Sequence, residues 1–424
     1  MTDDTLANAL NRHCHCINVD QDLLRESLEA RLGKAGAWSH LQESHPHLLA
    51  DSPVFISHGQ VRQMKELIEA IESVVSLETF QDHVLGWAPS IARHKAGAHG
   101  VFFGYDFHLT NDGPQLIEIN TNAGGALLLL QVASAQQACC SEVEKFVTGR
   151  IDTTDLEHTF VEMFRDELRG QLPGRELLRV AVVDESPAEQ YLSPEFTLFA
   201  RMFEHHSIDA VVTGPEAFTL IDRQLLMDGQ PVDLVYNRLT DFYLQSPACA
   251  VLNRACQDAA VVITPDPHTH AVYANKKNLT VLCDPERLRE LGADAATIAT
   301  LQQSLPKTEL VTAENADALW AERKRLFFKP AWGFGSRGTY KGAKLTRKTW
   351  DSIVGADYIA QALVPPSERL IVHDGDEKAL KLDVRCYTYK GEIQLLGARM
   401  YRGQTTNFRT DGGGLAAVFT APGG

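Results

Sequence analysis

A mixed fold, part α/β and part α+β, is what this sequence of 424 residues predicts. Three observations support it: helical periodicity through the first hundred residues, strands alternating with helical patterns from about 175 to 270, and paired strands with short turns in the last third. A chain of this length is too long for one ordinary core. We therefore expect three regions, at 1–150, 151–270 and 271–424.

The first region is predicted to consist of helices followed by a β-hairpin. Hydrophobic residues recur at helical spacing in two stretches, Leu23-Leu24-Leu28-Leu32 and Met64-Leu67-Ile68-Ile71. The pattern then changes to two strands, at 101–107 and 115–120, joined by an Asn-Asp-Gly turn. Acidic groups lie on this hairpin, which makes it a candidate site.

The middle region is predicted to be an open parallel sheet. Apolar runs typical of buried strands occur at 177–184, 208–212, 232–236 and 260–263, with a helical stretch at 195–205. Strands that alternate with helices indicate βαβ units, whose parallel strands are covered on both faces.

The last region is predicted to be an antiparallel α+β unit. Its expected strands lie at 325–330, 358–361, 381–389 and 394–400, with a Lys-Gly hairpin turn before the last. Glycine and polar residues crowd 404–414, as expected of a mobile loop at an active site.

Composition restricts the classes of partner. The formal net charge of −15 argues against broad binding of nucleic acid or anionic membranes, although a local basic pocket for a small anion stays open. No stretch is long and apolar enough to span a membrane, and the first residues contain no signal-peptide core. With eight scattered cysteines, we expect reduced thiols and a cytoplasmic location.

Asp106, Glu118 and Asn120 form the first candidate constellation. Glu118 and Asn120 are two apart on a strand and share a face, and the hairpin brings Asp106 within range. Two carboxylates and an amide oxygen are ligands that Mg²⁺ prefers. Two close carboxylates would repel each other without a cation. The alternative is an exposed hairpin with ordinary polar residues.

A glycine-rich segment at 333–338 follows Lys329 at the end of a predicted strand. Its glycines, Gly335 and Gly338 among them, allow backbone amides to approach phosphates, while Ser336 adds a hydroxyl and Lys329 a charge. Gly-Phe-Gly-Ser-Arg-Gly also fits a dinucleotide fingerprint, but the following residues indicate a strand or turn instead of a helix. A plain flexible loop is the alternative.

Arginines are concentrated near the end of the chain. Arg385 shares a strand face with Asp383, and Arg399 lies near the end of the next strand, before Arg402 and Arg409. Arginines around a phosphate could stabilise the charge of a transferring phosphoryl group. A solvated, salt-bridged face of the sheet is the alternative.

Together these segments resemble the ATP-grasp superfamily, whose members combine a lysine strand, a glycine-rich loop, an adenine-holding hinge, a D-x-R strand and an E-x-N metal motif. The segment at 358–365 is similar to the hinge, which implies that Gln361 lies near adenine and that the backbone of Ala362 and Val364 bonds it. The resemblance further implies that Lys276, Lys329 and the loop with Arg337 hold the phosphates of ATP.

The order of these motifs is similar to the circularly permuted branch, which includes eukaryotic-type glutathione synthetase and glutathionylspermidine synthetase. The metal motif lies upstream of the glycine loop, and Asp106 precedes Glu118 by twelve residues, as in the second of these families. One departure is Gly104, where permuted synthetases usually carry an arginine. The transition-state arginine must then be another, such as Arg385 or Arg399.

The resemblance implies an ATP-grasp ligase that depends on ATP and Mg²⁺, with Mn²⁺ as a substitute. It would activate a carboxylate, of an amino acid or small peptide, as an acyl phosphate and join it to an amine or a thiol. The parallel-sheet region, with Tyr236-Asn237-Arg238 and Asp241, is expected to bind these small-molecule substrates. A small-molecule kinase on the same fold, or a nucleotide-binding module without turnover, remains open, as does a homodimer.

Overall fold

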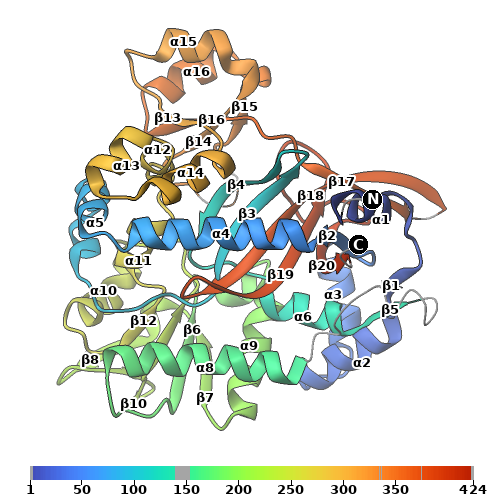
Figure 1. The fold of residues 1–424 in the computed structure, drawn as a ribbon. Helices are drawn as coiled ribbons and strands as arrows, with labels where there is room; N and C mark the ends of the chain where they lie inside the picture. Colours follow the sequence, from blue (N-terminus) through green and yellow to red (C-terminus); the bar gives the residue numbers. More distant parts are fainter. Residues whose placement is uncertain (1–2, 139–152, 334, 336, 374, 422–424) are drawn as a thin grey trace.

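The computed structural model describes residues 3–138, 153–333, 335, 337–373 and 375–421. Three of its sheets position the candidate residues: a seven-stranded, mostly antiparallel sheet, a four-stranded parallel sheet and a four-stranded antiparallel sheet (Figure 1). The predicted mixture of α/β and α+β architecture is therefore confirmed. The boundaries between the three predicted regions stay a prediction.

The seven-stranded sheet unites the two ends of the chain. Its strand order is β2-β20-β19-β18-β3-β4, with β17 paired beside β18. These strands comprise Val54–Ser57 (β2), Phe103–Thr110 (β3), Gly113–Asn120 (β4), Ser367–His373 (β17), Asp376–Tyr389 (β18), Glu392–Tyr401 (β19) and Gly414–Ala421 (β20). The predicted hairpin, β3 and β4, thus adjoins β18, some 280 residues later in the chain.

Helices cover both faces of this sheet. Helix α4 (His58–Val75) begins with a capping box at Ser57 and packs on the Cys386 face, where Met64 Sδ lies 3.7 Å from Cys386 Sγ. Helix α6 (Ala126–Ser134) covers the opposite face, because Leu129 fills the space beside Gly397, the strand partner of Arg385. The Arg385 face is therefore the one that carries the candidate residues.

The parallel sheet has the order β12-β11-β6-β7 and lies below the first sheet in Figure 1. Its strands match the prediction and comprise β6 (Arg179–Val183), β7 (Asp209–Thr213), β11 (Leu234–Asn237) and β12 (Val262–Thr264). The flanking helices are α8 (Thr153–Gln171), α9 (Ser193–His205), α10 (Ala250–Gln257) and α11 (Pro267–Tyr273). An unpredicted antiparallel group is attached to it: β8 (Phe218–Ile221), β9 (Gln224–Met227) and β10 (Gln230–Pro231).

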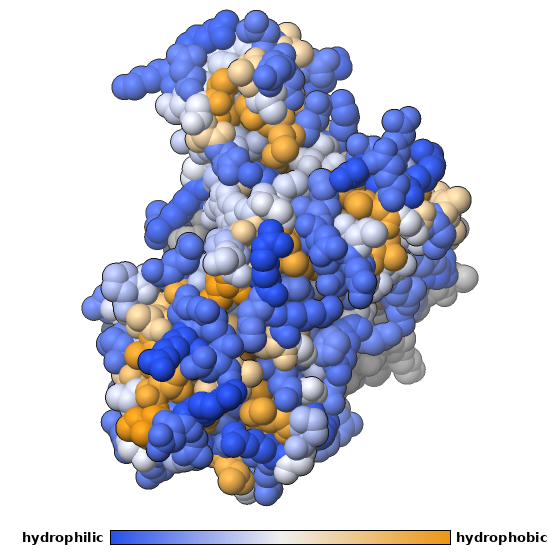
Figure 2. Space-filling view, turned by 90° about the vertical axis from the view of Figure 1, so that its left-hand side faces the viewer, coloured by the Kyte–Doolittle hydropathy of each residue, from blue (hydrophilic) through white to orange (hydrophobic). Residues whose placement is uncertain are grey.

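The third sheet belongs to a lobe that projects from the body, as Figures 1 and 2 show. It has the order β13-β16-β14-β15 and comprises Thr308–Leu310 (β13), Leu326–Pro330 (β14), Tyr340–Lys341 (β15) and Tyr358–Ala362 (β16). Helices α15 (Ala316–Glu322) and α16 (Arg347–Val354) pack on it through a small core with Phe328 and Trp350. Helices α12 (Asn278–Leu282), α13 (Pro285–Leu291) and α14 (Ala295–Ser304) connect the lobe to the body.

The N-terminal part is mainly helical, as predicted. It contains α1 (Asp3–His13), α2 (Gln21–Leu32), α3 (Ala37–Ser44) and α5 (Glu78–Val84), and the short strands β1 (Ile17–Val19) and β5 (Gln136–Ala138) pair beside them. Leu24 and Leu28 of α2 are buried. No helix in the described residues is long and apolar enough to cross a membrane. On the face in Figure 2, hydrophobic side chains form separate groups among hydrophilic ones.

Candidate active site

Strand register brings the three predicted metal ligands together. In the antiparallel pair of β3 and β4, Asp106 lies opposite Glu118 and Gly104 lies opposite Asn120. Residues directly opposite each other share one face of a sheet, so both carboxylates and the amide face the same side. A bulge after Asp106 interrupts the ladder there. Asn120 Nδ2 donates to Asp106 Oδ2 at 3.1 Å.

The two predicted arginines hold Asp106 from the neighbouring strands. Arg385 lies opposite Asp106 and donates from Nε and Nη2 to its two oxygens, at 2.6 and 2.8 Å. Arg399 donates from Nη2 to Asp106 at 2.8 Å and from Nε to the buried Asp383 at 2.7 Å. Burial by itself would raise the pKa of Asp106, but the two guanidinium groups outweigh it and hold this pKa below its usual value.

Gly104 provides the space that Arg385 occupies. A Cβ atom at position 104 would lie 2.9 Å from Arg385 Nε and 2.7 Å from the Cβ of Ala123. Any larger side chain at Gly104 would therefore displace the Arg385 guanidinium. The glycine at this position and the arginine on β18 are sterically matched, so the two residues depend on each other.

The two predicted phosphate-binding lysines contact β4, the strand of the hairpin that lies away from β18. Lys276 Nζ lies 3.0 Å from Glu118 Oε1 and donates to the carbonyl oxygen of Gly333 at 2.7 Å. Burial opposes the charge of Glu118, but Lys276 and Lys329 outweigh it and lower its pKa. Lys329 Nζ donates to the Ile117 carbonyl at 2.7 Å and to Gln361 Oε1 at 2.8 Å. Burial lowers the pKa of Lys329 to about 8.

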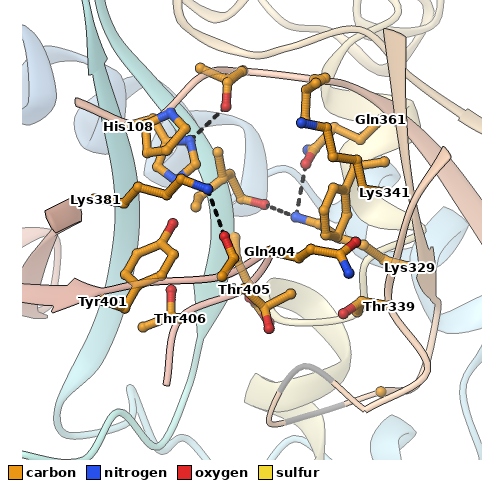
Figure 3. A pocket seen from close by; sticks show the side chains of 18 of the residues that line it. His108, Lys329, Thr339, Lys341, Gln361, Lys381, Tyr401, Gln404, Thr405 and Thr406 are labelled. Carbon is orange, nitrogen blue, oxygen red and sulfur yellow. Dashed lines mark hydrogen bonds between the residues drawn. The ribbon is translucent and has the colours of Figure 1, made fainter. Parts of the chain in front are cut away.

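Glu118, Lys276 and Lys329 line a cavity of about 370 Å³ between the lobe and the seven-stranded sheet, hereafter the central cavity. Figure 3 shows side chains of the lobe and of the large sheet pointing into it. Its basic lining residues are Lys276, Lys329, Arg337, Lys341, Lys344 and Lys381. Among the described residues that line it, Glu118 is the one acid. The excess of positive charge suits a polyanion.

One end of the central cavity is apolar. Ile117, Phe327 and Leu363 line it, and the hinge residues Gln361, Ala362 and Val364 adjoin them. The Ala362 N–H donates to the Lys307 carbonyl at 2.8 Å, and the Val364 carbonyl pairs with Nδ1 of His108 at 2.8 Å. The lining thus combines apolar side chains, hereafter the apolar slot, with basic ones, as ligand pockets with a few oriented polar groups do.

The glycine-rich segment borders the basic end. Gly333 and Arg337 line the cavity. Gly335 and Gly338 have φ angles of +57° and +68°, a left-handed conformation that glycine adopts without strain. The Gly338 carbonyl accepts a hydrogen bond from the Tyr358 hydroxyl at 3.0 Å, which ties the segment to β16. Ser336, predicted to bind phosphate, lies outside the described residues.

The three predicted ligands differ in how well they suit the Mg²⁺ ion that the resemblance implies. Asp106 Oδ2 already accepts three hydrogen bonds, and two guanidinium groups lie beside this carboxylate. Glu118 is held at one oxygen by Lys276, and the amide oxygen of Asn120 lies on the side away from Asp106. In the part of the chain that the structure describes, no three His, Cys, Asp or Glu side chains are grouped as a metal centre. Glu118 and Asn120 fit the ion, with phosphate oxygens and water as further ligands.

The predicted substrate residues of the parallel sheet separate into two kinds. Asn237 and Asp241 bond nearby backbone groups, since the Asn237 amide donates to the Pro265 carbonyl and Asp241 accepts from the Ser246 N–H. Arg238 is buried and reaches the segment after the β3–β4 hairpin, donating to the Asn122 carbonyl at 2.9 Å and to the Tyr236 hydroxyl at 3.1 Å. Its Nε has no hydrogen-bond partner among the described residues.

Several lining residues were not predicted from the sequence. Lys381 is on β18, two residues before Asp383 and four before Arg385, so the three side chains share one face of the strand. This spacing could have predicted that Lys381 lies near the site. His108 follows Asp106 on β3 in the same way. Lys341 is half-buried on the short strand β15, and Lys344 is exposed on the 3-10 turn that follows it. Nothing in their sequence context distinguishes them from surface lysines.

The sequence matches no protein-family model and no curated protein. A glutathione synthetase-like effector from Globodera pallida, solved in its apo form, aligns with 95% of this chain and 98% of its own, at 11% identity and a TM-score of 0.57. A gamma-glutamylcysteine synthetase-like protein from Methylobacillus flagellatus covers 86% and 87% of the two chains, at 12% identity and a TM-score of 0.46. The ATP-grasp ligase PsnB, with minimal precursor, Mg and ADP, covers 57% of this chain and 88% of its own, at 14% and 0.30.

Proposed function

The chain has the ATP-grasp fold of glutathione synthetase-like proteins, and on that fold we propose that it is an ATP-dependent ligase. It activates a carboxylate, of an amino acid or a small peptide, as an acyl phosphate and joins it to an amine or a thiol. The observation that carries the proposal is the central cavity, in which six basic side chains surround one carboxylate next to an apolar slot. That combination suits a purine with a triphosphate.

In this proposal ATP lies along the central cavity. The adenine ring enters the slot of Ile117, Phe327 and Leu363, with its polar edge at Gln361 and at the backbone of Ala362 and Val364. Lys329 and Lys276 hold the phosphates as point charges, together with the segment of Gly335, Ser336, Arg337 and Gly338. Lys329 already lies between hinge and hairpin, 2.8 Å from Gln361, which supports its position between base and phosphates.

Glu118 and Asn120 are the residues that would hold Mg²⁺ or Mn²⁺ on the phosphate side. The ion, when bound, supplies charge neutralisation on the phosphates. Asp106 can join them if Arg385 or Arg399 turns toward the nucleotide, because its oxygens are otherwise occupied. Such an exchange would release an arginine toward the reacting phosphate. In this proposal, metal binding by Asp106 and the release of an arginine therefore occur together.

Arg385 and Arg399 are the proposed catalytic residues. A substrate carboxylate oxygen attacks the γ-phosphorus, the bond from this phosphorus to the β,γ-bridging oxygen breaks, and ADP leaves. The guanidinium groups stabilise the charge that develops on the transferring phosphoryl group. The amine nitrogen then attacks the acyl carbon, phosphate leaves, and the nitrogen loses its proton to solvent. Closure around the site matters because an acyl phosphate hydrolyses readily.

Arg238 is the proposed contact for the substrate carboxylate or its peptide backbone. Its guanidinium is buried at the carboxyl end of β11, where parallel sheets bind ligands, and it adjoins the segment that follows Asn120. The free donor at Nε supports this role. Asn237 and Asp241, by contrast, shape the strand end and the following turn.

A hydroxylamine trap tests the reaction. The protein is incubated with ATP, Mg²⁺ and pools of amino acids, dipeptides and tripeptides, and hydroxamate and ADP are measured together. We expect one acid class to give equal amounts of both, because hydroxylamine intercepts an acyl phosphate. Lys329→Met should lower the rate by about a hundredfold or more, since it removes a charge that acts on the transferring group.

Lys348→Met is the matched control, because Lys348 is exposed on α16 and does not line the cavity. Its rate should equal that of the unaltered protein. A stable phosphate ester in place of the hydroxamate would make the protein a kinase. Absence of ADP with every acid would leave only a nucleotide-binding module.

A further inference from the structure

A second cavity, of about 460 Å³, is lined by the segments that precede β2 and β20 of the seven-stranded sheet. Its walls come from α2, α3, residues 45–51, His373 of β17 and residues 411–413. None of these belongs to the nucleotide, metal or carboxylate positions proposed above. Its volume is within the range of small-molecule sites.

The second cavity has a charge opposite to that of the central cavity. Asp51 and Asp411 both line it, and among the described residues that line it there is no lysine or arginine. Asp411 is already satisfied, since Lys378 and His373 lie 2.7 and 2.8 Å from its oxygens. Asp51 is therefore the acid that stays open to a ligand.

Among the residues that the structure describes, no lysine or arginine forms an ion pair with Asp51. Gln21 Nε2 donates to Asp51 Oδ1 at 2.6 Å, and this contact is neutral. Surrounding protein raises the pKa of Asp51 through loss of water, although Gln21 and the nearby His373 oppose the rise. Asp51 is nevertheless exposed, so a ligand in the cavity can reach its carboxylate. A ligand that brings a cation would add a charge-assisted contact to this carboxylate.

Part of the lining of the second cavity is apolar and aromatic. Leu24 and Leu41 are buried, Trp38 is half-buried, and all three line the cavity. His45 adds an imidazole whose pKa is lowered, first by burial and then by His40, so that it is neutral near pH 7. We propose that the second cavity binds a small primary amine, with its ammonium group at Asp51 and its apolar body against Trp38 and the two leucines.

One segment joins this amine site to the central cavity. Residues 402–413, hereafter the bridging segment, connect β19 to β20, with 403–406 lining the central cavity and 411–413 lining the second. Thr406 donates to Asp383 at 2.5 Å, and Lys381 donates to the Gly403 carbonyl at 2.6 Å. Its middle is held by Tyr191, which stacks on Phe408 with ring centroids 5.8 Å apart.

Matched ligands test the site on the unaltered protein without nucleotide. Phenethylamine, 2-phenylethanol and phenylacetate share a body and differ in charge, and their binding is measured by isothermal titration. We expect phenethylamine to bind at least about tenfold more tightly than 2-phenylethanol, because a charge-assisted contact is added. Phenylacetate should bind more weakly than either. Equal affinity for amine and alcohol would overturn the proposal.

Asp51→Asn keeps the shape of the side chain and should abolish this preference. Asp22→Asn is the control, since Asp22 is exposed on α2 next to Gln21, pairs with Arg25 and does not line the cavity. It should leave all three affinities unchanged. An unaltered preference in Asp51→Asn would contradict the site. Because no ATP is present, these outcomes are independent of the proposed ligase reaction.

Discussion

The central cavity and the second cavity border the same bridging segment, but the charged groups near them differ in burial and in the number of their partners. Next to the central cavity, four charged side chains are buried on paired strands and bond each other: Asp106 pairs with Arg385 and Arg399, and Arg399 pairs with Asp383. In the second cavity, Asp51 projects from a loop and has one neutral partner. The difference is consistent with the two proposals, of preorganised charges that stabilise a transferring phosphoryl group and of an exposed carboxylate that binds a cationic ligand.

The largest expected effect comes from breaking the buried ion pairs around Asp106. Arg385→Ala leaves Asp106 without its bidentate partner in a buried position, so we expect the free energy of unfolding to fall by about 3–5 kcal/mol. Asp51→Asn should change it by no more than about 0.5 kcal/mol, as at other exposed positions. Urea denaturation of both variants measures the contrast. Similar losses in the two would contradict the different roles of these charges.

Nucleotide affinity should separate the two cavities next. Lys329→Met removes a buried ammonium group from the central cavity, and we expect ATP to bind about a hundredfold more weakly. Asp51→Asn should bind ATP as the unaltered protein does. Isothermal titration with ATP and Mg²⁺ gives both values. If the lysine variant kept full affinity, ATP would have to bind elsewhere.

A change of pH should affect the central cavity selectively. Burial lowers the pKa of Lys329 to about 8, so the free protein carries this charge at pH 7 and has lost most of it at pH 9. ATP affinity should therefore fall by about tenfold over this interval. Lys329→Arg keeps its charge throughout and should show a flat profile. A flat profile in the unaltered protein would mean that Lys329 does not contact the phosphates.

The smallest expected effect concerns the bridging segment. Thr406→Val removes the hydroxyl that donates to Asp383 while keeping the side-chain shape, and ATP affinity should weaken by about fivefold. Thr405→Val is the matched control, because Thr405 also lines the central cavity without a contact to Asp383. Equal weakening by both variants would show that the threonine side chains act only by filling space.

Local periodicity allowed much of the fold to be predicted. The helices with Met64 and Leu28, the parallel strands and the β3–β4 hairpin were all expected, because spacing of 3.6 or 2 reflects which face is buried. The β8–β10 group was missed because its short strands show no clear alternation. Strand β18 begins at Asp376 instead of 381, since pairing with β17 extends it.

The candidate site was predictable where residues share a strand or a hairpin. Asp106, Glu118 and Asn120 were expected together and lie together. The sequence could not indicate that Arg385 and Arg399 would hold Asp106 so closely, because strand register across 279 residues depends on the whole sheet. The second cavity was beyond prediction, since four distant segments form it.

A crystal structure with Mg²⁺ and a non-hydrolysable ATP analogue tests the central claim most directly. We expect the adenine base in the slot of Phe327 and Leu363, the phosphates at Lys276 and Lys329, and a metal ion at Glu118 and Asn120. Density for the nucleotide in the second cavity, or phosphates turned away from both lysines, would contradict it.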